Sequence, residues 1–359
     1  MEDPKIPYRY LGNSGLKVSA ICLGTMTFGQ DGSRPGCDEA SSHALLDRFI
    51  LELGGNFIDT SDVYQFGVSE SIIGRWMEKH PSLRSKIILA TKVWGPMDKN
   101  DVNARGLSRH HIITEVEQSL SRLRTDYIDL YQIHCWDTGT PLEETLGALN
   151  TLVQTGKVHY IGVSNVTGWQ FQKIIDLSRA MGLTKIVSNQ AQYNLLCRST
   201  EWELLEVCKI EGVAMLPWSP LKGGLLTGKY KRGESPSSDS NSRLAWVEKD
   251  KATRANQASP SLSDYADNEQ YWELIEAMKT IATVHDATVS QVAIAWLLAQ
   301  PTVSSVVIGA RTVEQLDENI GSATLTLSKE ELETLNAKSR VPPPYPYEMV
   351  TRLQRGREH

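Results

Sequence analysis

Long hydrophobic runs are missing from this sequence of 359 residues. A membrane-spanning helix needs about 18 consecutive apolar residues, and AIAWLLA at 293–299 is among the longest runs here. The first ten residues, MEDPKIPYRY, contain neither a basic segment nor an apolar segment, so we expect no secretory signal. The sequence therefore predicts a cytoplasmic protein that does not insert into membranes.

An excess of positive charge is also missing. Lys and Arg total 37 against 43 Asp and Glu, for a net charge of −6, and the basic residues are scattered along the chain. Nucleic-acid binding depends on clustered cations that neutralise phosphates. We therefore expect no nucleic-acid partner, and a small molecule is the expected partner. An oligomer is compatible with the sequence.

Cysteine is scarce and shows no pairing pattern. The five cysteines are odd in number and have no C-x-x-C spacing, so reduced thiols fit better than disulfides or structural zinc. Cys22, Cys197 and Cys208 lie in apolar or helical surroundings, and we expect them in the core. Cys135 follows His134, but no second base pairs with it, so we expect no catalytic role for this thiol.

A metal site is not expected. His110 and His111 are neighbours at the start of a predicted helix. Adjacent residues do not share a helix face, so this pair lacks the spacing of metal ligands. We expect both side chains to be solvated.

Eight short apolar runs alternate with amphipathic stretches. Continuous apolar runs are typical of parallel strands buried on both faces, and the stretches between them have helical periodicity. Eight such units predict an α/β fold, a (β/α)8 TIM barrel. We expect one domain over residues 1–359, with the barrel at about 18–335. The eight runs are SAICLG, GNFID, KIILAT, IDLYQI, HYIGVS, IVSNQ, VAMLP and SSVVIG.

Three segments lie outside this alternation. YRYLGNSGLKVS at 8–19 predicts a β-hairpin around an Asn-Ser-Gly turn. A polar segment from about 229 to 268 follows the seventh strand, and a loop of this length is usually a lid or a binding loop. The tail at 339–359 contains VPPPYPYEMV. Either this tail closes over the substrate mouth or it lies on the surface.

Polar residues with complementary chemistry follow three of the runs. Asp59, Lys92 and His134 stand at the ends of GGNFID, KIILAT and IDLYQI, and Tyr64 comes five residues after Asp59. The C-terminal ends of barrel strands share one mouth, so we expect the four side chains to meet there. Singly, each has an ordinary explanation as a helix cap, a packing residue, a solvated lysine or a structural histidine. Together they predict one site.

The chemistry expected of this site is proton delivery to a carbonyl oxygen while hydride reaches the carbonyl carbon. A nearby ammonium stabilises phenolate, so Lys92 would lower the pKa of Tyr64 towards neutrality. Asp59 would hold the ammonium in place. The imidazole of His134 would fix the orientation of the carbonyl.

These motifs resemble the aldo-keto reductase superfamily. GGNFIDTSDVY, ILATK, IDLYQIH, YIGVSN and PWSPL occur in the expected order between about residues 8 and 335. KVWGP and RGLSRHHI are more similar to the branch that contains aryl-alcohol dehydrogenase-like reductases and potassium-channel β subunits. The resemblance implies that Tyr64 is the general acid, Lys92 lowers its pKa, Asp59 pairs with Lys92 and His134 orients the carbonyl.

A nicotinamide cofactor would bind here without a Rossmann fingerprint. No G-x-G-x-x-G opens a helix after a strand, and GTMTFG does not fit that spacing; the resemblance implies that the barrel holds the cofactor. Trp218 looks like the aromatic residue that stacks on the nicotinamide ring, with core packing as the alternative. Ser164, Asn165 and Gln190 end the fifth and sixth strands, and the alternative for them is that they only cap the strand ends. The other residues expected around the nicotinamide half are Gly24, Thr25, Met26, Asp59, Ser164, Asn165 and Gln190.

Two later segments are expected to hold the phosphates and the adenosine. GARTVEQLDEN at 309–319 leads from a strand end into a helix, where an anion is favoured and Arg311 is available as a partner. Thr312 and Gln315 also fit a capping box. The cation at Arg311 favours NADP over NAD. The residues expected at the pyrophosphate are Ser219, Pro220, Leu221, Gly223, Lys229 and Arg243. The resemblance implies that Gly309, Arg311, Gln315, Glu318 and Asn319 hold the adenosine end.

The sequence predicts NADPH-dependent reduction of aldehydes or ketones to alcohols, or the reverse oxidation. The alternative is a channel-associated or regulatory subunit that binds NADP and turns over slowly, and His134 counts against it because the channel subunits depart from the tetrad there. A non-catalytic scaffold would require coincidence at four positions. Several tryptophans favour aromatic or flat apolar substrates, although exposed or core tryptophans would give the same count. The expected pocket walls are Met26, Trp94, Trp136, Trp169 and the long loop with Trp246.

Overall fold

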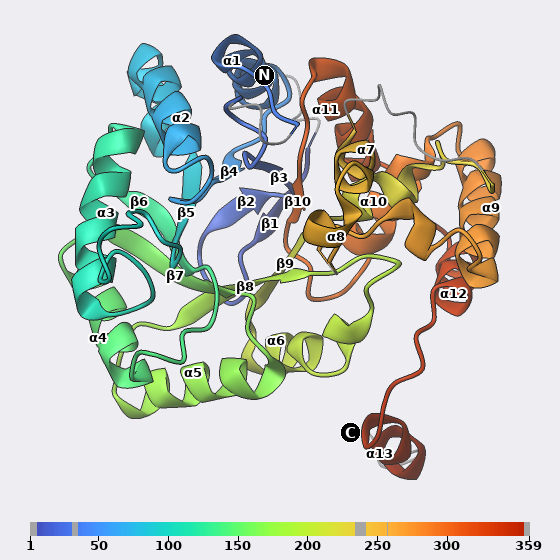
Figure 1. Cartoon of the computed structure of the whole chain (residues 1–359). Coiled ribbons are helices and arrows are strands. Elements are labelled where there is room, and N and C mark those ends of the chain that lie inside the picture. The colour runs from blue at the N-terminus through green and yellow to red at the C-terminus, as the bar shows by residue number, and fades with distance from the viewer. Residues whose placement is uncertain (1–5, 31–34, 234–241, 257, 355–359) are drawn as a thin grey trace.

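Eight parallel strands close into a barrel with helices around it (Figure 1). The computed structural model describes residues 6–30, 35–233, 242–256 and 258–354. Around the barrel the strands follow the order β10-β3-β4-β5-β6-β7-β8-β9, which is the (β/α)8 TIM barrel predicted from the alternation. The barrel strands are β3 (Ile21–Gly24), β4 (Phe57–Asp59), β5 (Ile88–Val93), β6 (Ile128–Ile133), β7 (Val158–Ser164), β8 (Ile186–Gln192), β9 (Ala214–Trp218) and β10 (Val306–Ile308).

Amphipathic helices cover the outer faces of the strands. Their apolar sides join the outward side chains of the strands in one large hydrophobic cluster, which is how such a barrel buries both faces of a parallel sheet. A π-helical turn, Asp47–Glu52, extends the first helix. The helices of the ring are α1 (Glu39–Leu46), α2 (Val68–Lys79), α3 (Arg109–Leu123), α4 (Leu142–Gln154), α5 (Gly168–Ala180), α6 (Leu204–Glu211), α9 (Glu269–Val284), α10 (Val289–Leu298), α11 (Val313–Ile320) and α12 (Lys329–Lys338).

The predicted elements and the observed ones agree closely, and one difference concerns the site. The stretch RHHIITEVEQSLSRL is α3 over its whole length. The run KIILAT, however, belongs to a strand that continues to Val93. Lys92 therefore lies inside β5, paired in register with Gln132 on β6, and not beyond the strand end.

The predicted hairpin closes the N-terminal end of the barrel. It consists of β1 (Tyr8–Tyr10) and β2 (Lys17–Ser19). Leu11 and Val18 pack against the side chains that fill the barrel from below, and these include the first residues of β4, β5 and β9. Gly12 has a φ of +56°, and a Cβ there would lie 2.7 Å from the Ala214 nitrogen and from the Gly212 carbonyl oxygen. Only glycine fits this turn.

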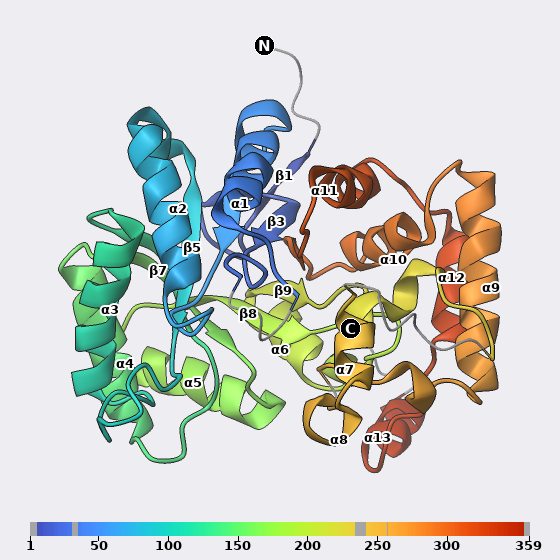
Figure 2. The ribbon, with the colours of Figure 1, turned by 45° about the horizontal axis from the view of Figure 1, so that its top comes forward.

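The segment at 229–268, which we expected to be a loop, contains helices in its described part. These are α7 (Arg243–Glu248) and α8 (Lys251–Arg254), followed by the 3-10 turn Leu262–Asp264. Figures 1 and 2 show α7 and α8 beside one another. Side chains of α7 are buried, so the segment packs on the barrel. Residues 234–241 and 257 lie outside the described part.

The tail lies on the surface, the second of the two arrangements that the sequence left open. Its helix α13 (Tyr347–Gln354) has no buried residue and stands apart from the helix ring in Figure 1. Tyr347 anchors it, because the phenol donates to Glu203 at 2.6 Å and the ring stacks on Trp202 with centroids 6.0 Å apart. Residues 355–359 are not described.

Two expectations about single side chains are wrong. His110 is exposed, but His111 is buried, because Ser108 caps α3 and the first turn of the helix docks against the core. Burial lowers the pKa of His111. Cys22 and Cys208 are buried as expected, whereas Cys197 is only half-buried, in the loop after β8. All five cysteines are free thiols.

Helices α9 and α10 are the most apolar consecutive pair in the ring. Met278 and Trp296 are fully buried side chains on these helices. Among the described helices, none alone is long and apolar enough to cross a membrane, and α9 and α10 meet that criterion only together, with a bend of 93° between them.

We predict that Gly12→Ala destabilises the barrel more than Gly182→Ala does. Gly182 has a similar φ of +64°, but a Cβ there would meet nothing within 4 Å. The left-handed backbone alone costs about 1–2 kcal/mol for alanine, and the clash at Gly12 adds roughly 1–3 kcal/mol. Urea unfolding followed by circular dichroism measures both. Equal losses for the two variants would contradict the packing of the hairpin on β9.

Candidate active site

Asp59, Lys92 and Tyr64 form one hydrogen-bonded group at the C-terminal end of the barrel. Lys92 Nζ donates to Asp59 Oδ2 at 2.6 Å, to the Thr60 carbonyl oxygen at 2.8 Å and to Tyr64 Oη at 3.2 Å. Asp59 and Lys92 are buried, and Tyr64 is half-buried. All three hydrogens of the ammonium are therefore used, and one of them points the cation at the phenol.

The second oxygen of Asp59 is held by two amides. Gln132 on β6 donates to Asp59 Oδ1 at 3.0 Å, and Gln190 on β8 donates to the same atom at 2.8 Å. Both amides project into the barrel, as Asp59 on β4 and Lys92 on β5 do. Four strands thus contribute one side chain each to a buried polar cluster.

The ion pair keeps Lys92 charged. Burial alone lowers the pKa of Lys92, but the charges of Asp59 and Tyr64 and its hydrogen bonds to both outweigh burial, so the pKa of Lys92 is raised. Asp59 compensates the buried cation at close range, which such a charge requires in the interior.

His134 follows β6 and lies beside the phenol. The rings of Tyr64 and His134 meet edge to face, with centroids 6.0 Å apart. His134 Nδ1 lies 3.0 Å from Ser61 Oγ. Burial and the charge of Lys92 lower the pKa of His134 to about 3, so its imidazole is neutral at physiological pH.

The loop that carries Tyr64 is fixed by its neighbours. The hydroxyl of Ser69, at the start of α2, contacts the hydroxyls of Thr25 and Thr60 at 2.8 and 2.9 Å. Gln65 has a φ of +54°, and its side-chain amide donates to the Gly29 carbonyl at 2.9 Å. These contacts tie the loop to the segments that follow β3 and β4. They explain how Tyr64, a loop residue, is held against Lys92 on β5.

Of the residues expected near the nicotinamide, those after β3 lie beside Asp59. Gly24 pairs with Asp59 in register, and a Cβ on Gly24 would lie 2.8 Å from the Val307 side chain. Thr25 is buried, and its hydroxyl donates to the Asp59 carbonyl at 3.0 Å. Met26 is half-buried at the mouth. Thr25 thus connects the end of β3 to the backbone of Asp59.

The expected residues on β7, β8 and β9 also reach this mouth. Ser164 is buried and donates to the Gln190 carbonyl at 2.8 Å. Asn165 is exposed, and its amide donates to the His134 carbonyl at 2.9 Å. The side-chain NH2 of Gln190 is engaged by Asp59. The indole nitrogen of Trp218, at the end of β9, is buried without a hydrogen-bond partner among the described residues.

The turn after β9 brings several expected cofactor residues together. Gly223 has a φ of +67°, and a Cβ there would lie 3.8 Å from Arg243 Cδ. A Cβ on Gly224 would lie 3.7 Å from Lys229 Nζ. Arg243, the first residue of α7, also donates to Ser259 Oγ at 2.5 Å. Two cations therefore border this turn, whose remaining expected residues are Ser219, Pro220 and Leu221.

The start of α11 presents a half-buried cation next to open space. A Cβ on Gly309 would meet nothing within 4 Å. Burial lowers the pKa of Arg311. Thr312 caps the helix, because its side chain accepts from the Gln315 N–H. In a capping box the Gln315 side chain would accept from the Thr312 N–H. Here it accepts from the Arg311 N–H at 3.0 Å. The other two expected residues, exposed Glu318 and buried Asn319, lie in the last turn of α11.

Comparison with known proteins identifies the family. The model of the Aldo/keto reductase family matches residues 20–340. The chain belongs to this family. Protein tas of Escherichia coli is 36% identical, and the match covers 93% of this chain and 98% of that protein. The uncharacterized oxidoreductase YrpG of Bacillus subtilis is 38% identical over 92% of this chain and 94% of the relative. Norsolorinic acid reductase of Aspergillus flavus is 35% identical, and the match covers 92% of this chain and 80% of that protein.

The chain is therefore an oxidoreductase of a family that generally uses NAD(P)H and reduces carbonyl groups. Sequence reasoning missed three residues of the site in this aldo/keto reductase: Gln132, Ser61 and Asp62. The signal for Gln132 was present, because a polar residue in the middle of the apolar run IDLYQI is unusual. Ser61 and Asp62 gave no such signal, since only the loop conformation brings Ser61 to His134 and Asp62 to Ser61.

Aromatic side chains border the mouth of this reductase. The rings of Trp136 and Trp169 meet edge to face with centroids 5.7 Å apart, and Trp169 is exposed. Trp94 is half-buried. The guanidinium of Arg254 lies 4.7 Å from the ring centroid of Trp246.

Cys135, which follows His134, has only a weak contact. Its Sγ lies 3.9 Å from the Asn165 carbonyl oxygen. Burial raises the pKa of this thiol. A raised pKa disfavours the thiolate that nucleophilic chemistry requires.

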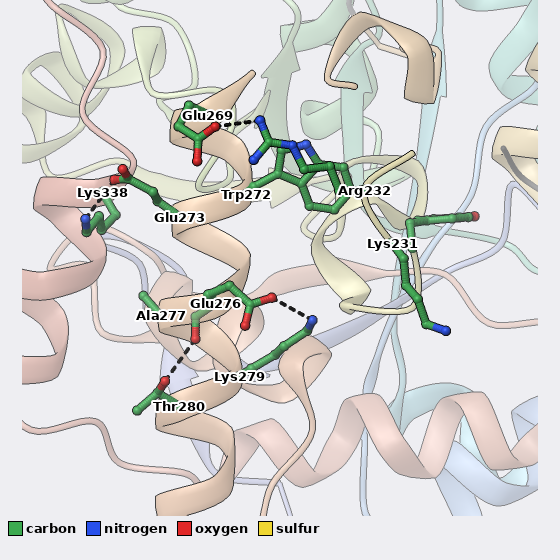
Figure 3. A pocket seen from close by; sticks show the side chains of 11 residues that line it. Lys231, Arg232, Glu269, Trp272, Glu273, Glu276, Ala277, Lys279, Thr280 and Lys338 are labelled. Carbon is green, nitrogen blue, oxygen red and sulfur yellow. Dashed lines mark hydrogen bonds and ion pairs between the residues drawn. The ribbon is translucent and has the colours of Figure 1, made fainter. Parts of the chain in front are cut away.

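An open groove elsewhere on the surface is not the active site (Figure 3). It runs along α9, next to Tyr230 and Lys338. Its charged groups neutralise one another, as in the pairs Arg232–Glu269 at 2.6 Å and Lys338–Glu273 at 2.8 Å. No cluster of three or more His, Cys, Asp or Glu side chains able to hold a metal ion occurs in the described part of the chain.

We predict that the two members of the buried ion pair are energetically coupled. Asp59→Asn leaves the Lys92 ammonium buried without a countercharge, and Lys92→Met leaves the Asp59 carboxylate buried without one, so each single variant should lose about 3–5 kcal/mol of stability. Urea unfolding of both variants and of the double variant measures the coupling. Single losses that add in the double variant would contradict a coupled pair.

Proposed function

We propose that this protein catalyses the NADPH-dependent reduction of aldehydes and ketones to alcohols. The contact between Lys92 Nζ and Tyr64 Oη, inside a buried ion pair at the barrel mouth, carries the proposal. A phenol held against an ammonium is suited to give a proton to a carbonyl oxygen. Membership of a family of carbonyl reductases supports this chemistry.

Each residue of the tetrad has a separate task in the reaction. Bound NADPH supplies the hydride that the carbonyl carbon accepts. Tyr64 donates its proton to the carbonyl oxygen, and the resulting phenolate is stabilised by the Lys92 ammonium at 3.2 Å. Asp59 holds that ammonium in place at 2.6 Å. His134 is neutral, and it orients the substrate without adding charge to the site.

Three features of the chain fit a dinucleotide phosphate. The glycine turn after β9 presents backbone between Lys229 and Arg243, as a pyrophosphate site requires. Arg311 lies at the N-terminus of α11 beside the open space at Gly309, and this cation favours NADPH over NADH. The indole nitrogen of Trp218 is buried without a hydrogen-bond partner among the described residues, and this ring would contact the nicotinamide.

The substrates that we propose are aromatic or flat apolar carbonyl compounds. The crossed pair of Trp136 and Trp169 offers apolar faces beside His134, and such faces favour flat rings. Relatives support this choice through their names, which include norsolorinic acid reductase and, in Aspergillus parasiticus, versiconal hemiacetal acetate reductase. The alternative of a slow, NADP-binding regulatory or channel-associated subunit is not favoured, because the whole tetrad is present and these named relatives are reductases.

Tyr64→Phe tests the proton donor. We expect wild-type protein to oxidise NADPH in the presence of 4-nitrobenzaldehyde, and the variant to lose about 10²–10⁴-fold in kcat, the usual contribution of a general acid. The matched control is Tyr10→Phe, at an exposed residue of the hairpin. Unchanged turnover in Tyr64→Phe would remove Tyr64 as the acid. Tight NADPH binding without turnover of any carbonyl by the wild type would favour the regulatory subunit.

Arg311→Met tests the choice of cofactor. Loss of a hydrogen-bonded charge pair costs about 1.5–3 kcal/mol, so we expect the Kd for NADPH to rise about 10- to 100-fold. The Kd for NADH should change little, because NADH lacks the phosphate. Fluorescence titration measures both constants, and Arg232→Met in the surface groove serves as control. An equal loss for NADPH and NADH would show that Arg311 does not read the phosphate.

A further inference from the structure

Gln132 is a fully buried amide in the interior of the barrel, near the end of β6. Burying an amide is unfavourable unless its hydrogen-bonding groups find partners. Its Nε2 donates to Asp59 Oδ1 at 3.0 Å, and its Oε1 accepts from Gln190 Nε2 at 3.4 Å. Gln132 therefore belongs to the polar cluster around the ion pair.

The carboxylate of Asp59 fixes the orientation of both amides. An ionised carboxylate only accepts hydrogen bonds, so the group of Gln132 that faces Asp59 Oδ1 must be its NH2. The same holds for Gln190, whose nitrogen lies 2.8 Å from this oxygen. Two amide donors thus converge on Oδ1, while the other oxygen, Oδ2, accepts from Lys92 at 2.6 Å.

The neighbouring strand leaves space for this amide. Gln132 is paired in register with Lys92 on β5 and with Gly162 on β7. A Cβ on Gly162 would lie 3.1 Å from Gln132 Cγ and would overlap the hydroxyl of Ser188 on β8. A larger residue at position 162 would therefore press on the Gln132 side chain.

The amides change how Asp59 shares the ammonium with the phenol. Each N–H places a partial positive charge beside Oδ1 and so offsets part of the carboxylate charge. Lys92 Nζ donates to Asp59 at 2.6 Å and to Tyr64 at the longer distance of 3.2 Å. With fewer amide donors, Asp59 would attract the ammonium more strongly and present more negative charge to the phenol. Both effects disfavour the phenolate that forms when Tyr64 gives up its proton.

Other titratable groups surround Tyr64, but they lie outside this connection. The nearest described ones are Lys92 on β5, which bonds the phenol, Asp59 on β4, which bonds Lys92, and His134 after β6, whose ring meets the phenol edge to face. Asp62 follows in the loop of Tyr64 itself, with the charges of Glu70 on α2 and Glu115 on α3 acting on it.

We propose that Gln132 is a positioning residue for the proton transfer, because its N–H offsets part of the Asp59 charge and leaves the Lys92 ammonium shared with Tyr64. Gln132 acts through Asp59 and Lys92 and not through contact with the reacting atoms. This role rests on the proposed function, in which Tyr64 is the proton donor. The effect on the phenol belongs to the protein alone, so it can be measured without turnover.

The titration of Tyr64 tests the proposal. Gln132→Met keeps the length of the side chain and removes the amide. In protein labelled with ¹³C at the Cζ of tyrosine, Tyr64→Phe assigns the signal of Tyr64, which is then followed against pH. We expect the midpoint of the Tyr64 titration to rise by roughly half a pH unit to one unit in Gln132→Met. An unchanged or lower midpoint would overturn the proposal.

A second variant guards against loss of the fold. Gln132→Asn keeps an amide in the interior, but its side chain is one carbon shorter and no longer reaches Asp59 Oδ1, which lies 3.0 Å from the Gln132 amide. Circular dichroism shows whether each variant is folded. We expect the same rise of the midpoint as in Gln132→Met, and a wild-type midpoint in folded Gln132→Asn would contradict the proposal.

Ser188→Ala is the matched control. Ser188 pairs with Gly162 in register, and its buried hydroxyl has no hydrogen-bond partner among the described residues. This change alters the interior beside Gln132 without removing a donor from Asp59, so we expect the wild-type midpoint. A shift as large as that of Gln132→Met would assign the effect to a general disturbance of the barrel interior and exclude the role of Gln132.

The same shift should appear in the reaction. Oxidation of 4-nitrobenzyl alcohol with NADP requires Tyr64 as the base, so its kcat/KM rises with pH through the Tyr64 titration. We expect this rise to move to higher pH in Gln132→Met by the interval that the spectra show. A lower kcat/KM with an unmoved pH profile would indicate a merely structural role and contradict the proposal. A wild type without turnover, together with the shifted midpoint, would contradict the proposed function and leave the effect of Gln132 on Tyr64 in place.

Discussion

The buried ion pair between Asp59 and Lys92 is the interaction on which the site depends. Two charges in a barrel interior are stable only when their remaining hydrogen-bonding groups are also satisfied. Here Asp59 accepts from Lys92, Gln132 and Gln190, and Lys92 donates to Asp59, Thr60 and Tyr64. Because the partners come from β4, β5, β6 and β8, shifting one strand by a residue would leave a buried charge unpaired. The pair therefore links the register of the barrel to the placement of the phenol.

A second buried charge network lies on the other side of the same strand. Thr91 precedes Lys92 on β5, and successive side chains of a strand point to opposite faces. Thr91 accordingly donates to Glu70 on α2 at 2.6 Å, and Glu70 also accepts from Arg122 on α3 at 2.7 Å. The interior network carries a cation towards the substrate mouth. The exterior network leaves the carboxylates of Glu70 and Glu115 near Asp62, and their charges raise the pKa of Asp62. On the interior side, the charge of Lys92 lowers the pKa of His134.

Periodicity predicted the fold well because most residues of the barrel strands are buried and most ring helices have one apolar side. The tetrad was predictable for a related reason, since parallel strands of a barrel end at one rim. Prediction failed where a contact depends on tertiary structure. Ser61 reaches His134 only through the conformation of its loop, and the solvated environment expected for His111 was wrong because Ser108 turns that helix end into the core. The helices α7 and α8 are too short, at six and four residues, to produce a periodic signal.

The site divides its tasks between strands and loops. The charges next to Tyr64 are fixed inside the barrel, where a change of one residue leaves a buried group unpaired. Trp136 and Trp169, whose rings meet edge to face, lie in segments after the strands, where side chains can change without altering the ion pair. Loop substitutions should therefore alter which carbonyl compound is accepted without altering the proton transfer. Ser61 links the two regions, because it lies in the loop after β4 and its hydroxyl contacts His134 at 3.0 Å.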